Sequence, residues 1–140
     1  MNIYLAARFG RKQEMQAYAY ALESVGHGTT SSWVFAKNDK PAVELTCHEL
    51  CGLAMRNSAD IARSDLVMLF TERDSREWLN TNTRFAEVGE AIGRGIQVMR
   101  VGPAELNLYS AHPRLLVADN WLEALAILTA TPYRSTRQCN

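Results

Sequence analysis

Short apolar runs along the chain are separated by longer segments in which apolar residues recur at helical spacing. Continuous apolar runs, which are typical of strands covered on both faces of a sheet, occur at residues 3–7, 66–70, 96–101 and 115–118. Residues 29–34 are predicted to form one more strand. Apolar positions three and four residues apart predict helices at residues 12–24, 43–63 and 121–128, and a fourth helix within residues 81–95.

The order of these elements favours an α/β fold, in which helices cover both faces of a sheet. We expect a three-layer sandwich with a mostly parallel five-stranded sheet. Because crossovers are right-handed, few strand orders are possible, and the flavodoxin-like order 2-1-3-4-5 is the predicted one. Residues 1–130 are then a single domain, and residues 131–140 are predicted to be a flexible tail.

Composition excludes some classes of partner. The chain has 15 basic and 15 acidic residues, so it has no net charge that would attract a nucleic-acid polymer or a membrane. No apolar run approaches the ~20 residues that span a bilayer. The first residues lack the basic segment of a signal peptide, and the 3 cysteines cannot all pair with one another, so we expect a cytoplasmic protein with reduced thiols.

Glu87 is the leading candidate for chemistry. It is predicted to lie in the first turn of a helix, close to a buried stripe, at the sheet edge where parallel α/β proteins bind ligands. The helix dipole there would favour the ionised carboxylate by roughly 0.3–1 kcal/mol. A carboxylate held in a cleft can act as a nucleophile. The alternative is a glutamate that only complements the dipole.

The loop after the first strand suits an anion. Arg8, Gly10 and Arg11 precede a helix start, where backbone N–H groups and the helix dipole favour negative charge. Arg8 could bind a phosphate through two hydrogen bonds. The alternative is an exposed basic turn. Trp33, at the end of a predicted strand, could stack on a planar ligand or cap the core with its indole N–H bonded to a neighbour.

Asp60 and Asp65 flank the end of the 43–63 helix, which could be broken near Gly52 or at residues 57–58. Asp60 could reach the Glu87 cleft. The alternative is that both aspartates are solvated or pair with Arg56 and Arg63.

Cys47 and Cys51 share one face of the same helix, with His48 between them. A structural zinc ion requires about four ligands, and no second Cys/His pair is close in sequence. We therefore expect two small buried thiols, no metal site and no cofactor.

Three segments resemble one known family. They are residues 3–8, residues 60–65, and residues 85–91 followed by 95–98. In their order and spacing they are similar to the nucleoside 2-deoxyribosyltransferase superfamily, which includes the deoxynucleoside 5′-monophosphate N-glycosidases. The resemblance covers most of residues 1–101.

The resemblance implies an enzyme that acts on the N-glycosidic bond of a small-molecule nucleoside or nucleotide. Glu87 matches the glutamate that attacks the anomeric carbon of the sugar and forms a glycosyl ester. Asp60 matches an aspartate that handles the base or its protons, and Tyr4 a tyrosine that positions the nucleophile. The substrate-binding residues expected with this reading are Ala6, Arg8, Gly10, Arg11, Trp33, Thr81, Thr83 and Asn107.

Two features affect the choice of substrate and partner. Thr81 occupies a position where the transferases often have an aspartate. The monophosphate hydrolases have a hydroxyl residue there, which binds the phosphate. Family members share sites between subunits, so a homo-oligomer is expected, with Asn107 and Ser110 in the region that would be shared. The base, the sugar and the acceptor remain open.

Competing functions also remain open. Residues 82–84 replace a glycine-containing turn of the family, and Arg84 is unexpected beside the nucleophile. These departures permit a non-catalytic nucleotide-binding module on the same fold. A receiver-type signalling domain is disfavoured, because Arg8 and Arg11 occupy the place where it would need an acidic cluster.

Overall fold

The computed structural model describes residues 1–37, 44–72, 83–105 and 108–130. Five parallel strands form one sheet in the order β2-β1-β3-β4-β5, which confirms the predicted fold class and strand order. The strands are β1 (Asn2–Ala6), β2 (Gly28–Thr29), β3 (Leu66–Phe70), β4 (Gln97–Val101) and β5 (Leu116–Ala118).

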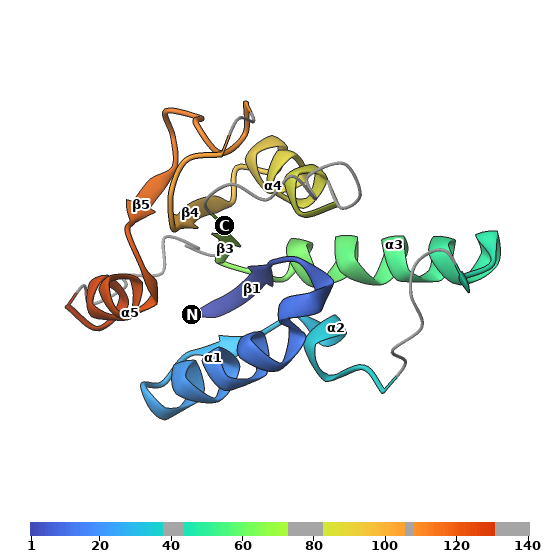
Figure 1. Cartoon of the computed structure of the whole chain (residues 1–140), viewed down its shortest axis with the longest axis horizontal. Coiled ribbons are helices and arrows are strands. Elements are labelled where there is room, and N and C mark those ends of the chain that lie inside the picture. Colours follow the sequence, from blue (N-terminus) through green and yellow to red (C-terminus); the bar gives the residue numbers. More distant parts are fainter. Residues whose placement is uncertain (38–43, 73–82, 106–107, 131–140) are drawn as a thin grey trace, which may run out of the picture.

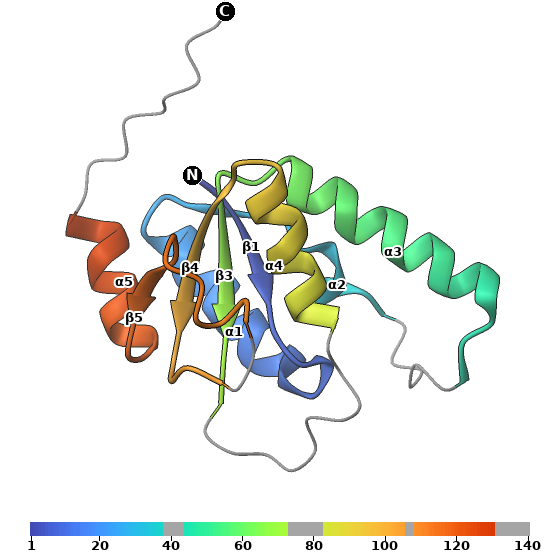
Figure 2. The ribbon, with the colours of Figure 1, turned by 90° about the horizontal axis from the view of Figure 1, so that it is seen from above.

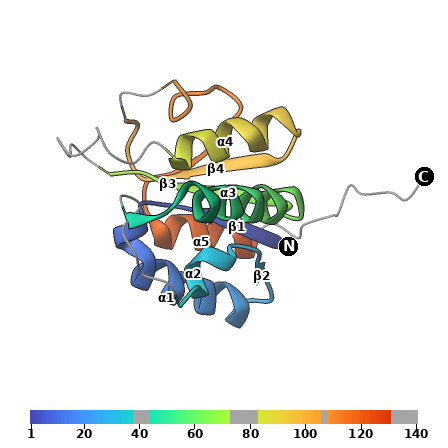
Figure 3. The same ribbon diagram turned by 90° about the vertical axis from the view of Figure 1, so that its right-hand side faces the viewer.

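The helices form a layer on each side of this sheet. Figure 1 shows α4 above the strands and α1, α2 and α5 below them, and Figure 3 shows the same layers from the side. The helical elements are η1 (Phe9–Arg11), α1 (Lys12–Ser24), α2 (Ser32–Phe35), α3 (Cys47–Ala62), α4 (Thr83–Gly93) and α5 (Trp121–Ala130).

The core lies around the two central strands. All of β3 is buried, and so are residues 3–6 of β1, as expected for strands covered on both faces. Ile3 to Ala6 of β1 are in register with Leu66 to Leu69 of β3. Helix α1 covers this pair with Met15, Ala19 and Leu22, which are all fully buried and spaced as predicted.

The predicted strand at residues 29–34 is wrong beyond Thr29. Ser32–Phe35 form the short helix α2 instead. The reason is that side chains, and not a longer β2, bind the backbone groups of Leu5 in β1. The Ser31 hydroxyl accepts a hydrogen bond from the Leu5 N–H, and the Trp33 indole donates one to the Leu5 carbonyl at 3.0 Å. With these backbone groups occupied, the ladder ends and the chain can turn into a helix.

Helix α3 is unbroken, so the predicted interruption near Gly52 or residues 57–58 is wrong. It starts at a capping box, in which the Thr46 hydroxyl accepts from the Glu49 N–H at 3.2 Å and the Glu49 carboxylate accepts from the Thr46 N–H at 2.8 Å. Figure 2 shows its first half projecting away from the sheet. Cys47 and Cys51 lie on that half and are exposed, so the expectation of buried thiols is also wrong.

Residues 1–37, 44–72, 83–105 and 108–130 contain no group of three or more His, Cys, Asp or Glu side chains that could hold a metal ion. None of the described helices combines the length and apolar character that crossing a bilayer requires.

Candidate functional site

Glu87 lies at the centre of a hydrogen-bonded group formed by three elements. The Tyr4 hydroxyl, from the middle of β1, donates to Glu87 Oε1 at 2.8 Å. The Asn57 side-chain amide, from α3, donates to the same oxygen at 3.0 Å. Among the described residues no side chain or N–H donates to Oε2. One carboxylate oxygen is therefore fixed by two donors, while the other is available to a ligand.

The environment of Glu87 differs from the predicted one. Helix α4 begins at Thr83, so Glu87 is in its second turn and the first-turn prediction is wrong. The pKa of Glu87 is raised from 4.5 to about 7, mainly by burial and to a smaller extent by the negative charge of Glu90. The hydrogen bonds from Tyr4 and Asn57 act in the opposite direction. Loss of hydration outweighs the favourable contacts, so the carboxylate is a stronger base than an exposed one.

Tyr4 is a fully buried phenol. Its pKa is raised well above 10, first by burial and then by the negative charge of Glu87. The hydroxyl therefore stays protonated at any ordinary pH. It can act as a permanent hydrogen-bond donor to Glu87 and not as a base.

Asn57 was missed by the sequence reasoning. It is one helical turn before Asp60 on α3, and that spacing was a usable signal, because residues three apart share a helix face. The Oδ1 atom of Asn57 is buried and has no hydrogen-bond partner among the described residues. Such an atom is costly to leave unpaired, and a ligand group that donates a hydrogen bond would satisfy it.

Asp60 is almost fully buried, at 2% exposure, but it is bonded elsewhere. Its Oδ2 atom accepts from the Ser32 N–H at 2.9 Å and from the Ser32 hydroxyl at 2.6 Å. Its Oδ1 atom forms an ion pair with Arg63, as the alternative prediction stated. The structure therefore connects Asp60 to α2 and the end of α3, without a hydrogen bond to Glu87.

Trp33 lies against β1, with its indole N–H bonded to the Leu5 carbonyl and 9% of its surface exposed. Of the two predicted roles for Trp33, stacking on a ligand or capping the core, this arrangement matches the second. Ala6 is buried at the end of β1, Gly10 is exposed in η1, and Thr83 is exposed at the start of α4. Two predicted substrate-binding residues, Thr81 and Asn107, lie outside the described residues.

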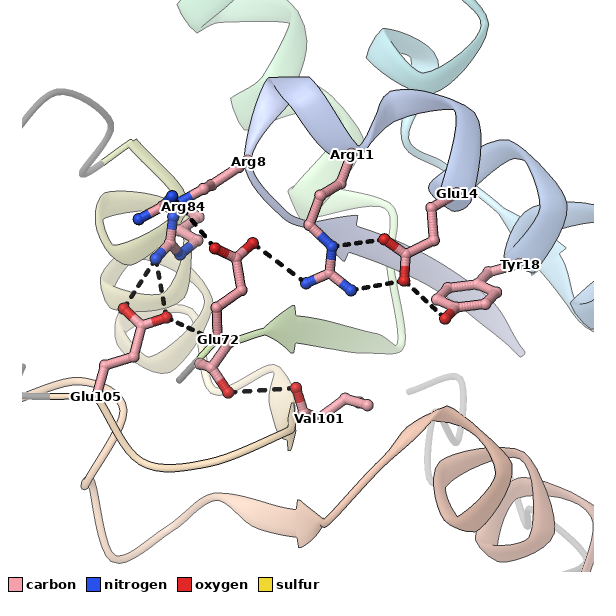
Figure 4. A network of polar contacts seen from close by, with 9 residues as sticks. Arg8, Arg11, Glu14, Tyr18, Glu72, Arg84, Val101 and Glu105 are labelled. Carbon is pink, nitrogen blue, oxygen red and sulfur yellow. Dashed lines mark hydrogen bonds and ion pairs between the residues drawn. The ribbon is translucent and has the colours of Figure 1, made fainter. Parts of the chain in front are cut away.

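Arginines and glutamates form a network at the carboxyl edge of the sheet (Figure 4). Arg8 Nη1 is 3.2 Å from Glu72 Oε2, and Arg11 Nη1 is 3.5 Å from Glu72 Oε1. Arg11 also donates to both oxygens of Glu14, at 2.6 and 2.7 Å. The predicted anion-binding loop thus faces a carboxylate of its own chain.

Arg84 belongs to the same network. It is 3% exposed, and its Nη2 atom donates to the two oxygens of Glu105 at 2.9 and 2.8 Å. Arg84 is therefore paired with Glu105 and makes no hydrogen bond to Glu87. Ser110, which was expected near a shared site, is buried and donates to the Glu105 carbonyl at 2.7 Å.

A cavity of about 250 Å³ opens at the ends of β3 and β4, beside α1 and α5. Tyr18 and Trp121 form one wall, with their rings stacked at 4.1 Å and 11°. Arg11 and Glu72 line another part of it. Glu87 does not line this cavity, so the cavity and the Glu87 group are separate features of the molecule.

Comparison with known proteins identifies the fold. No protein-family model matches the chain, and no curated protein matches its sequence. Several solved structures do match, and two of them are, by their names, enzymes that act on nucleosides or nucleotides. A 2-deoxyribosyltransferase from Bacillus psychrosaccharolyticus has a TM-score of 0.65 and 17% identity, with 96% of this chain and 100% of that chain covered. A CMP N-glycosidase from Clostridium botulinum has a TM-score of 0.59 and 15% identity, with 94% and 100% covered.

These matches extend over nearly the whole chain. They show that it shares the fold of these two proteins. At this level of identity the comparison establishes the fold, and the chemistry has to be argued from the side chains.

Proposed function

We propose that this protein is an enzyme that cleaves or transfers at the N-glycosidic bond of a nucleoside or nucleotide, with Glu87 as the nucleophile. One observation carries the proposal. A partly buried carboxylate has two donors on Oε1 and, among the described residues, none on Oε2. The likeness to a glycosidase and a deoxyribosyltransferase supports it.

In the first step, Glu87 Oε2 attacks the C1′ atom of the sugar. The C1′–O bond forms as the C1′–N bond breaks, and the bonding electron pair leaves with the base, which takes a proton from water. The transition state resembles an oxocarbenium ion, which a nearby carboxylate stabilises. Tyr4 and Asn57 keep the attacking group in one orientation, and such positioning is a large part of catalysis.

In the second step, water or a second base attacks C1′ and the Glu87 carboxylate leaves. The product is a free sugar or a new nucleoside. Asn57 cannot supply a proton, because an amide is not an acid at ordinary pH. We infer that it is a positioning residue, which holds Glu87 through its NH₂ group and offers Oδ1 to a donor on the substrate.

Asp60 remains the proposed residue on the base side of the site. Its carboxylate fixes Ser32 at 2.6 Å and so holds α2 against α3. Trp33, the next residue of α2, is thereby placed against Leu5 of β1. On this proposal Asp60 acts through α2, and its loss would disturb the position of the base more than the attack at C1′.

One observation favours the alternative, a non-catalytic nucleotide-binding module. The cavity of about 250 Å³ lies apart from Glu87, so a ligand could bind there without meeting the carboxylate. The two functions differ in whether a base is released.

The test is an incubation with a panel of nucleosides and their 5′-monophosphates, with and without a free acceptor base, followed by chromatography of the bases. Base release without acceptor identifies a hydrolase, and base exchange identifies a transferase. Glu87→Gln is expected to abolish both, while Glu90→Gln, the same change one turn further along α4, retains them. Nucleotide binding without release or exchange by the wild-type protein would support the binding module instead.

A further inference from the structure

Two arginines at the carboxyl edge of the sheet converge on one glutamate. Arg8 follows β1, Arg11 ends η1, and Glu72 comes two residues after β3. The carboxylate of Glu72 meets Arg8 through Oε2 and Arg11 through Oε1 (Figure 4). The side chains are 14%, 23% and 26% exposed for Arg8, Arg11 and Glu72, so the contact is partly shielded from water. A phosphate or carboxylate ligand would use the same two cations in the same way.

The main chain holds Glu72 in this place. Its backbone N–H donates to Glu105 Oε1 at 2.9 Å, and Glu105 in turn is held by the buried Arg84. The backbone of Glu72 is therefore fixed by a hydrogen bond, while its carboxylate forms two ion pairs. The fold therefore holds this carboxylate between Arg8 and Arg11, unlike a surface side chain that forms an ion pair only transiently.

Among the described residues, the charges of this network balance. Its three arginines, Arg8, Arg11 and Arg84, face three glutamates, Glu14, Glu72 and Glu105. A phosphate that entered with Glu72 in place would bring about 1.5–2 negative charges without a matching cation in this set. Partly buried charges without a partner are costly, so the phosphate would have to displace the carboxylate. The cavity beside Arg11 and Glu72 provides room for that displacement.

We propose that Glu72 is an internal anion that occupies a binding site formed by Arg8 and Arg11. While it is present, the site selects ligands with a neutral group at this position. For the identity of the substrate this inference rests on the proposed function: the preferred substrate is a nucleoside with a free 5′-hydroxyl, and its 5′-monophosphate is disfavoured. Glu72 is thus a specificity-determining residue.

The first test measures binding of inorganic phosphate by calorimetry and does not depend on turnover. Glu72→Gln keeps the shape of the side chain and removes its charge. It is expected to bind phosphate at least about tenfold more tightly than the wild type, since one charge-assisted hydrogen bond or more becomes available. Glu23→Gln, on the exposed surface of α1, makes the same change in net charge and is expected to match the wild type. Adding Arg8→Met to Glu72→Gln should remove the gain.

The second test compares kcat/KM for a nucleoside and its 5′-monophosphate. The ratio of monophosphate to nucleoside is expected to rise at least about tenfold in Glu72→Gln and to stay unchanged in Glu23→Gln. Glu72→Ala provides a second variant, and circular dichroism confirms that each one is folded. Equal phosphate affinity in folded Glu72→Gln, Glu72→Ala and wild type would overturn the inference. If phosphate binding rises but no variant releases a base, the anion site stands and the proposed enzymatic function fails.

Discussion

Replacing Glu87 with glutamine tests the electrostatics of the candidate site without requiring a substrate. The side-chain carbonyl of glutamine can still accept the hydrogen bonds that Tyr4 and Asn57 make to Oε1. The NH₂ group takes the place of Oε2, which has no hydrogen-bond donor among the described residues. The substitution therefore removes the charge and keeps both hydrogen bonds and the volume of the side chain.

The expected effect follows from the pKa of Glu87, which rises from 4.5 to about 7 on folding. A carboxyl group with a higher pKa in the folded state stabilises folding while it is protonated. That stabilisation is complete below about pH 4.5 and is lost as the pH rises through about 7. At 1.36 kcal/mol per pH unit the full effect is about 3 kcal/mol, and partial access of solvent to this half-buried residue reduces it to about 2 kcal/mol.

Glu87→Gln should therefore exceed the wild type in free energy of unfolding by about 2 kcal/mol at pH 8, and by less than about 1 kcal/mol at pH 5. Urea unfolding at several pH values measures the difference, in which the titration of all other groups cancels. Glu23→Gln controls for the change in net charge. A difference between Glu87→Gln and wild type that does not vary from pH 5 to pH 8 would refute the reasoning, because it would mean that Glu87 is not buried in the way described.

Two further predictions concern the hydrogen-bonded group around Glu87, and a third concerns the turn at Gly102. Tyr4→Phe removes a hydrogen bond that lowers the pKa of Glu87, so the rise of kcat/KM with pH, expected near pH 7 in the wild type, should move to higher pH; an unshifted profile would remove Tyr4 from the site. Asn57→Asp places a second carboxylate against Glu87, so the last proton of the pair should be lost at a higher pH than the proton of wild-type Glu87. Activity at pH 7 should then fall at least about tenfold and recover in part at pH 9. NMR titration of the carboxyl carbons measures the pKa values of the pair directly. Gly102→Ala should lower the stability measured by thermal unfolding by about 2 kcal/mol or more, because Gly102 has φ 113° and a Cβ there would lie 2.8 Å from the Thr71 carbonyl oxygen. Gly95→Ala is the control, with φ 72° and open space around the added Cβ, and should cost about 1 kcal/mol. Equal losses in the two variants would contradict the close approach at Gly102.

The parts of the fold that could be predicted are those where local pattern and tertiary burial agree. The central strand Leu66–Phe70 and the helix Lys12–Ser24 have the predicted bounds, because a continuous apolar run and a clear helical stripe leave one arrangement that buries them. The short helix α2 could not be predicted in the same way. It depends on Ser31 and Trp33 meeting the backbone of Leu5, which is 26 and 28 residues away.

The candidate site shows the same division. Tyr4 and Glu87 were identified in sequence and are in contact, although they are 83 residues apart. The helix dipole was expected to favour the ionised form of Glu87, but burial outweighs such effects and raises its pKa. Glu72 was not identified, since its role comes from contacts across the sheet edge that no local spacing reveals. Asn57 was also missed, although it lies one helical turn before Asp60 and shares a helix face with it. Thr81 and Asn107 remain predictions.

The central claim is that Glu87 forms a covalent bond to the sugar. Mass spectrometry of the protein, quenched in acid within seconds of mixing with a substrate identified by base release, tests it most directly. The account predicts a population of protein that is heavier by one glycosyl group, with the added mass on the peptide that contains Glu87 and none in Glu87→Gln. Rapid base release with no such adduct, or an adduct on another residue, would contradict it.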